Sequence, residues 1–156
     1  MGKTFEDSHQ NILQSMLSVC LEFIGDEADG IYLHCSAENG TSSADVFFDI
    51  NGSLCQTHEL DRGKVVTADF SSRTFDEQLS SLLECLLNDL DQLNELYEDN
   101  GRDPPTEMRL RYDVIQGRLS VTFSYEPQFS NTDTLLPFDV FNAWYEEVKS
   151  QREIAT

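Results

Sequence analysis

The chain of 156 residues carries 29 aspartates and glutamates against 10 lysines and arginines, a formal net charge of -19. This charge repels nucleic acid and anionic lipid, so we expect neither as a partner, and it favours basic protein surfaces instead. Because 39% of the residues are hydrophobic and 10% aromatic, in clearly periodic segments, we expect one folded domain over residues 1–156 rather than a disordered acidic chain.

The first predicted element is an amphipathic helix near the N-terminus. It is expected to begin at Thr4, whose hydroxyl can cap it while Asp7 supplies an acid three residues on, and to end at Gly25. Apolar residues recur along it at helical spacing: Ile12, Leu13, Met16, Leu17, Cys20, Phe23 and Ile24. One face of this helix is therefore expected to be buried.

Two or three strands are predicted next, because the hydrophobic period changes to two. Residues 31–37 alternate between apolar and polar side chains, which is typical of a half-buried strand, and residues 44–50 form a second strand. Asn51-Gly52 predicts a type I′ turn, which needs a positive φ at both central residues. A third strand is expected within residues 53–60.

Residues 61–73 leave two alternatives open, a short strand in VVTADF or an irregular approach to a long central helix. Thr74 and Glu77 have the capping-box spacing that opens a helix, and Asn100 with Gly101 closes it. Apolar residues between them recur at steps of three and four: Phe75, Leu79, Leu82, Leu83, Leu86, Leu90, Leu93 and Tyr97.

The same central segment, residues 74–101, contains eight acids and no lysine or arginine. At about 100° per residue, a stripe that points away from the leucines consists of Glu77, Glu84, Asp91, Glu95 and Glu98. Like charges spaced this way destabilise a helix by a few tenths of a kcal/mol per pair. From the helix alone, this stripe is either a solvated surface or a binding surface.

A hairpin and a last helix complete the predicted elements. Residues 108–125 alternate regularly around Gln116-Gly117, which predicts two strands with one packed side and one side open to water or a partner. Four of the ten basic residues lie in this region: Arg102, Arg109, Arg111 and Arg118. Pro137 can open the last helix, whose apolar side is Phe138, Phe141, Trp144 or Tyr145, and Val148.

The predicted element order is α-β-β-(β)-α-β-β-α, which indicates an α+β fold. An antiparallel β-sheet joined by short hairpins, with the α-helices packed on one face, is the simplest arrangement that buries every apolar stripe.

The sequence lacks the motifs GxGxxG, GxxxxGK[ST], GxSxG and HExxH. His34, Cys35, Cys55 and His58 could be imagined as zinc ligands, but adjacent strand residues point to opposite faces, so His34 and Cys35 cannot easily share a metal. An exposed acidic stripe also lacks the apolar wall that raises a pKa for proton transfer. We therefore expect a protein that is not an enzyme and holds no metal or cofactor.

The cysteines Cys20, Cys35, Cys55 and Cys85 occur singly among apolar neighbours, without a CxxC pair. Buried, reduced thiols are the simplest interpretation. No signal peptide or membrane span is visible in the sequence, so we expect a cytoplasmic location.

The stretch from Leu90 to Tyr125 runs from the acidic leucine helix through YEDNGRDPPT into a hairpin that ends in FSYE. It resembles the YezG-like family of bacterial antitoxin and immunity proteins, and the early strands IYLHCSAENG and DVFFDI are similar to the first hairpin of that family. The sequence differs from the family pattern at Pro105, where a tryptophan is expected, and at Ser124, where an acid is usual.

The resemblance implies an immunity protein, or antitoxin, that binds and neutralises a cognate polymorphic toxin, often a nuclease. A nuclease holds its polyanionic substrate on a basic surface, which an acidic protein can occupy. The predicted toxin-binding residues are Glu84, Asp91, Glu95, Glu98 and Asp99 of the central helix, with Asp45 and Asp49 of the second strand.

Tight binding also needs an apolar anchor, for which Tyr32, Phe47 and Phe129 are the candidates. The alternative function is an acidic adaptor or chaperone-like module that binds a basic or amphipathic segment without inhibiting its partner.

Overall fold

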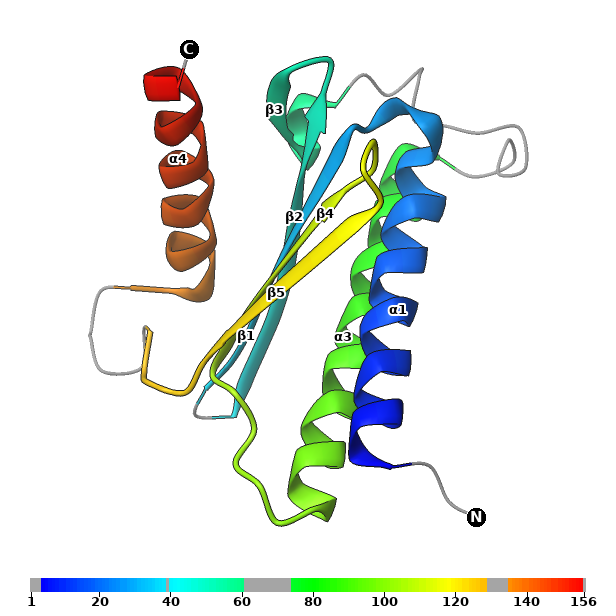
Figure 1. The fold of residues 1–156 in the computed structure, drawn as a ribbon, viewed down its shortest axis with the longest axis vertical. Coiled ribbons are helices and arrows are strands. Elements are labelled where there is room, and N and C mark those ends of the chain that lie inside the picture. The colour runs from blue at the N-terminus through cyan, green and yellow to red at the C-terminus, as the bar shows by residue number, and fades with distance from the viewer. Residues whose placement is uncertain (1–3, 39, 61–73, 129–134, 156) are drawn as a thin grey trace.

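The computed structural model describes residues 4–38, 40–60, 74–128 and 135–155 (Figure 1). The helices are α1 (Phe5–Ile24), α3 (Phe75–Asp99) and α4 (Pro137–Ala155), with short 3-10 turns η1 (Gly25–Glu27) and η2 (Thr57–Glu59). The strands are β1 (Gly30–Glu38), β2 (Thr41–Ile50), β3 (Ser53–Gln56), β4 (Glu107–Asp113) and β5 (Arg118–Ser124). This order confirms the predicted α+β class and includes the third strand. No helix in these described ranges is both long and apolar enough to cross a membrane.

The five strands form one antiparallel sheet in the order β3-β2-β1-β4-β5. The central strand β1 pairs with β2 from Gly30↔Asp49 to Glu38↔Thr41, and on its other side with β4. Because β4 comes from beyond α3 in the chain, the sheet joins the strands before the central helix to the hairpin after it.

The ends of these elements follow the predicted local chemistry. The hydroxyl oxygens of Thr4 and Thr74 each accept a hydrogen bond from the backbone N–H three residues on, at 3.1 Å in both helices. Asn51 and Gly52 have φ values of 53° and 83°, as a type I′ turn between β2 and β3 requires. Local sequence therefore specifies where both long helices begin and how β3 folds back.

One face of the sheet packs against α1 and α3. In β1 the side chains of Ile31, Leu33 and Cys35 point to these helices, as do Val46 and Phe48 of β2. The helices contribute the predicted stripes to this core: Leu13, Met16, Cys20, Phe23 and Ile24 from α1, and Leu82, Leu86, Leu90 and Leu93 from α3. The apolar periodicity of both helices is thereby confirmed.

The opposite face of the sheet is covered by α4, which lies across the sheet from α1 and α3 in Figure 1. Tyr32 and Phe47 stack there with ring centroids 4.5 Å apart, beneath Phe141, Trp144, Tyr145 and Val148. The prediction that all helices pack on one face is therefore wrong for α4. The reason is that Tyr32 and Phe47 lie on the side of the strands that was expected to face solvent. These two large rings need a helix to cover them. As a result β1 is buried on both faces, not half-buried as predicted.

All four cysteines are free thiols. Cys20 and Cys35 are buried as predicted, and burial raises the pKa of the Cys20 thiol to about 12 and also raises the pKa of Cys35. Cys55 is partly buried, and Cys85 is exposed at the edge of the α3 leucine stripe, so the prediction of burial is wrong for Cys85. The two alternatives for residues 61–73 lie outside the described residues.

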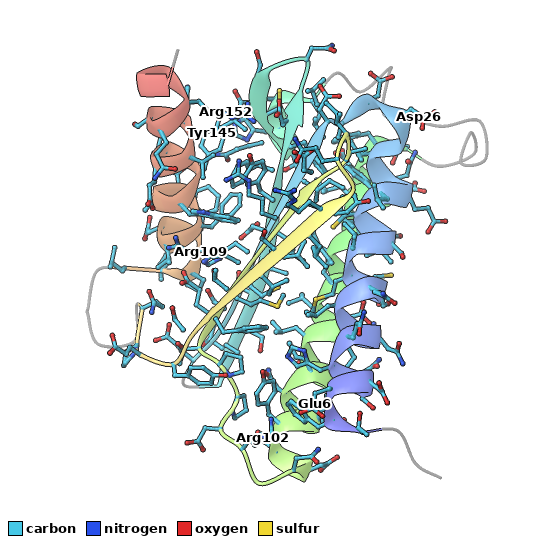
Figure 2. All side chains as sticks on the ribbon, in the orientation of Figure 1. Glu6, Asp26, Arg102, Arg109, Tyr145 and Arg152 are labelled. Carbon is cyan, nitrogen blue, oxygen red and sulfur yellow. The ribbon has the colours of Figure 1, made fainter. Side chains whose placement is uncertain are left out.

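An aromatic cluster ties α1 to α3 and β5. The His9 Nε2 atom lies 3.0 Å from the hydroxyl oxygen of Tyr97, and the His9 ring centroid lies 5.4 Å from that of Phe123. Burial lowers the pKa of His9, while the charge of Glu6 raises it less and that of Arg102 lowers it slightly. Figure 2 shows Glu6 and Arg102 at this same end of the molecule. The cluster therefore favours a neutral imidazole.

Replacing Phe47 tests the second core. Phe47→Ala removes a fully buried ring that contacts Tyr32 and three residues of α4, so we expect a loss of about 3–5 kcal/mol in the free energy of unfolding. The measurement is urea denaturation followed by circular dichroism. Phe138→Ala, at a position that is 53% exposed on α4, is the control and should change the stability by less than about 0.5 kcal/mol. A loss below about 1 kcal/mol for Phe47→Ala would contradict the packing of α4 on the sheet.

The His9 environment predicts a pH dependence of stability. The folded pKa of His9 lies below its ordinary value of 6.5, so the unfolded state binds more protons between the two pKa values. The contribution of His9 is therefore complete above about pH 6.5 and is lost as the pH falls through the folded pKa. Urea titrations at pH 7.5 and 5.5 should show a larger loss for the wild-type chain than for His9→Gln, which does not titrate. Equal losses in the two proteins would contradict the assignment.

Candidate functional site

Five exposed carboxylates follow one side of α3, and we call this set the acidic ridge: Glu84, Asp91, Glu95, Glu98 and Asp99. At 1.5 Å per residue, the ridge extends about 21 Å along the helix from Glu84 to Glu98. The buried leucines of α3 occupy the opposite side of the helix. The structure therefore brings together all five acids that were predicted on this helix, on a surface open to a partner.

The ridge is electrostatically unfavourable for its own helix. Asp91 with Glu95, and Glu95 with Asp99, are like charges four residues apart. The last turn of α3 carries acids and no basic residue, although the C-terminal end of a helix is its negative pole. The ion pairs found among the described residues involve none of these five acids. The ridge therefore lowers the stability of α3 rather than raising it.

A hollow of about 160 Å³ lies between α1 and α3 at the N-terminal end of the ridge. Val19, Phe23 and Leu82 give it an apolar lining, and Cys85, which follows Glu84 in the chain, also lines it. Glu22 adds an exposed carboxylate from α1. An apolar recess thus adjoins the acids of α3.

Asp45 and Asp49 lie elsewhere. They alternate with the core residues Val46 and Phe48 along β2, so they point to the face that α4 covers. Asp49 forms an ion pair with Arg152, which reaches from α4 toward the strands in Figure 2. The structure therefore does not bring these two acids to the ridge. Strand alternation together with the aromatic residues on the same face could have indicated this.

The predicted anchors are also displaced from the ridge. Tyr32 and Phe47 are 2% and 0% exposed and belong to the core beneath α4, so neither can contact a partner at α3. Phe129 lies outside the described residues. The sequence did not indicate the hollow between α1 and α3, because it forms from two helices that are far apart in the chain.

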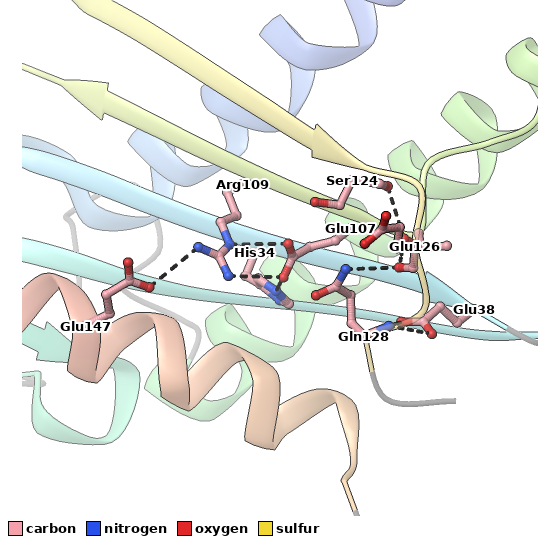
Figure 3. Close-up of polar contacts among 9 residues, drawn as sticks. His34, Glu38, Glu107, Arg109, Ser124, Glu126, Gln128 and Glu147 are labelled. Atoms are coloured by element: carbon pink, nitrogen blue, oxygen red, sulfur yellow. Dashed lines mark hydrogen bonds and ion pairs between the residues drawn. The ribbon is translucent and has the colours of Figure 1, made fainter. Parts of the chain in front are cut away.

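A buried polar network lies between the sheet and α4 (Figure 3). His34 Nε2 donates a hydrogen bond to Glu107 Oε2 at 2.8 Å, and Arg109 Nε lies 3.3 Å from Glu107 Oε1. Arg109 also reaches toward Glu147 of α4, with Nη1 3.8 Å from Oε2. Burial acts to raise the pKa of Glu107, but the hydrogen bond from His34 and the charge of Arg109 outweigh it and hold that pKa below its usual value. Glu107 is therefore ionised and paired inside the protein.

The inner part of this network is enclosed, since His34 is 2% and Glu107 5% exposed, whereas Glu147 at its outer end is exposed. A buried ion pair of this kind satisfies charges that would otherwise be costly to bury, and it fixes how neighbouring elements meet. Sequence analysis did not single out Glu107, because its partners His34 and Arg109 come from strands that only the folded sheet brings together. Among the residues that the structure describes, no group of three or more histidines, cysteines or acids could hold a metal ion.

Known proteins do not extend these observations. Neither the protein-family models nor the curated proteins include a match to this chain. The resemblance to the YezG-like family stays a prediction, and we base the function on the ridge and its surroundings.

The dipole of α3 predicts opposite effects on stability for glutamate-to-lysine substitutions at its two ends. Glu98→Lys places a cation at the negative C-terminal end of the helix and should raise the free energy of unfolding by about 0.3–1 kcal/mol. Glu77→Lys makes the same change of charge in the first turn and should lower it by a similar amount. Thermal unfolding of both variants measures the difference. If both variants shift in the same direction, the effect comes from the overall charge and not from the place on the helix.

Proposed function

We propose that the chain is an immunity protein that binds and neutralises a cognate protein toxin with a basic surface, using the acidic ridge of α3. The observation that most supports this function is a row of exposed carboxylates along one side of α3, most of them at positions where they destabilise their own helix. An oppositely charged partner gives such a row a use that stability does not. Asp45 and Asp49 are left out of the proposed interface because they lie on the other face of the sheet.

A nuclease domain fits this partner best. It must hold a polyanionic substrate on a basic surface, and a ridge about 21 Å long can lie along that surface and keep nucleic acid away. Attraction between the two charged surfaces speeds their encounter by roughly 10- to 1000-fold, and salt reduces this gain. Rapid capture is useful when the toxin acts on the cell's own nucleic acid.

The hollow beside the ridge supplies the apolar contact in this proposal. Charge complementarity increases the association rate and specificity more than the affinity, so a tight complex also needs a desolvated contact. Val19, Phe23 and Leu82 form a recess for one apolar side chain of the toxin, and Glu22 and Cys85, the chain neighbour of Glu84, also line it. This recess takes the place of the anchors predicted at Tyr32 and Phe47.

Co-expression tests the function directly. The product of the adjacent gene is expressed alone and then together with this chain, and growth and nucleic acid integrity are followed. Growth arrest that this chain relieves is the expected result. A stable complex without any relief of toxicity would instead support the adaptor alternative, and a harmless neighbour that forms no complex would contradict both.

Charge reversal on the ridge should abolish neutralisation. We expect the triple substitution of Glu84, Asp91 and Glu95 by lysine to weaken toxin binding about 100-fold or more, because like charges then face each other across the interface. Calorimetric titration gives the affinity, and circular dichroism shows that the variant is folded.

The matched control reverses three exposed acids that do not belong to α3, namely Glu6, Asp26 and Glu146, and therefore changes the net charge equally. It should keep most of the affinity. An equal loss in both triple variants would show that overall charge, and not the ridge, attracts the toxin.

A further inference from the structure

The strand β5 forms an edge of the sheet and pairs, among the described strands, with β4 alone. Exposed edges are usually protected by charged side chains, by proline or by being very short. The opposite edge strand β3 has four residues, whereas β5 has seven, with no charge or proline from Leu119 to Ser124. In Figure 1, β5 crosses in front of the other strands and no described element covers it. This edge is therefore able to pair with another strand.

The surface next to this edge is also uncharged. Residues 8–21 of α1 contain no aspartate, glutamate, lysine or arginine, although 25% of the chain is charged. The exposed side chains of this stretch are all polar and neutral: Gln10, Asn11, Gln14, Ser15 and Ser18. His9 and Phe123 bring α1 and β5 into contact, with ring centroids 5.4 Å apart. Ser15 donates a hydrogen bond to Asp89 and so lies on the α3 side of α1, whereas the neutral surface beside His9 continues to the strand edge.

Charge identifies the partner of this neutral surface. A molecule with a net charge of -19 repels a second copy of itself, so two copies can meet only where acids are absent or are paired with bases. A basic partner gains nothing here, and the acidic ridge on α3 is the surface that suits it. A second copy of the chain is the partner that requires a neutral contact.

The residues of β5 and the two that follow it are chemically symmetric about Thr122. If two copies pair antiparallel with Thr122 opposite Thr122, residues of matching character face each other: Ser120 with Ser124, Val121 with Phe123, Leu119 with Tyr125, and Arg118 with Glu126. Leu119 is 38% and Tyr125 56% exposed, so the pairing covers two apolar side chains that are open in one copy. Each copy also gains an ion pair at both ends of the strand.

We propose that the chain forms a two-fold symmetric dimer in which β5 pairs antiparallel with β5 of a second copy, centred on Thr122. The contact is isologous, as closed dimers require, and it joins two sheets into one. Helix α3 packs against α1 and β2 and meets the end of β5 through Tyr97, which is on its buried side, so the acidic ridge on its outer side stays open in each copy. The dimer is therefore independent of the proposed toxin binding and compatible with it.

Cross-linking tests the symmetry. In a Cys85→Ser background, Thr122→Cys places two thiols opposite each other, where paired Cβ atoms are about 4.5–5.5 Å apart. Mild oxidation with copper phenanthroline should give a covalent dimer on a non-reducing gel. Ser120→Cys is the control, because residue 120 faces residue 124 and not its own counterpart. This variant should give no covalent dimer on the gel. Equal cross-linking of both variants, or of neither, would overturn the proposed pairing.

Sedimentation equilibrium of the full chain tests the ion pairs at the ends of the strand. Arg118→Glu and Glu126→Arg should each weaken the dimer at least tenfold, and the double variant should return to within about threefold of the wild type. Glu126→Arg reduces the net negative charge, so tighter association of this variant would show that only general repulsion matters and would overturn the pairing. The pairing would also be overturned if the wild-type chain sediments as a 17.8 kDa monomer at millimolar concentration. If the β5 amides are protected from hydrogen exchange only in a complex with the toxin, the strand edge binds the toxin and not a second copy.

Discussion

The burial of β1 on both faces is the constraint on which the rest of the structure depends. Its side chains alternate between an apolar set around Leu33 that faces α1 and α3, and a set around Tyr32 and His34 that faces α4. A strand with no exposed face requires a cover on each side of the sheet. The positions of the helices therefore follow from this one strand, and α4 cannot leave the sheet without exposing Tyr32 and Phe47 to water.

The two faces of the sheet are stabilised differently. The face under α1 and α3 is an apolar core, whereas the face under α4 combines stacked aromatic rings with the Glu107 carboxylate, which is paired with Arg109 and hydrogen-bonded to His34. Buried pairs of this kind specify one arrangement of neighbouring elements more than they add stability. The acids of the ridge instead stand on the outer side of α3, where water can solvate them.

Local features of the fold could be predicted from the sequence, and its long-range arrangement could not. The caps at Thr4 and Thr74 and the turn at Asn51-Gly52 depend on neighbouring residues, and they were predicted correctly. Periodicity shows which residues share a face, but it does not show which helix covers that face, so α4 was placed on the wrong side. The ridge was found because helical spacing alone defines it. Asp45 and Asp49 were grouped with it by residue type, without regard to the face of the sheet on which they lie.

The place of α4 after all five strands in the chain has a consequence for biosynthesis. The ribosome releases the five strands before it releases the helix that covers their second face, because protein synthesis runs from the N-terminus. Until then the rings of Tyr32 and Phe47 form an uncovered aromatic patch on the nascent chain, which is the kind of surface that general chaperones hold. Folding of the sheet thus cannot be completed until α4 has left the ribosome.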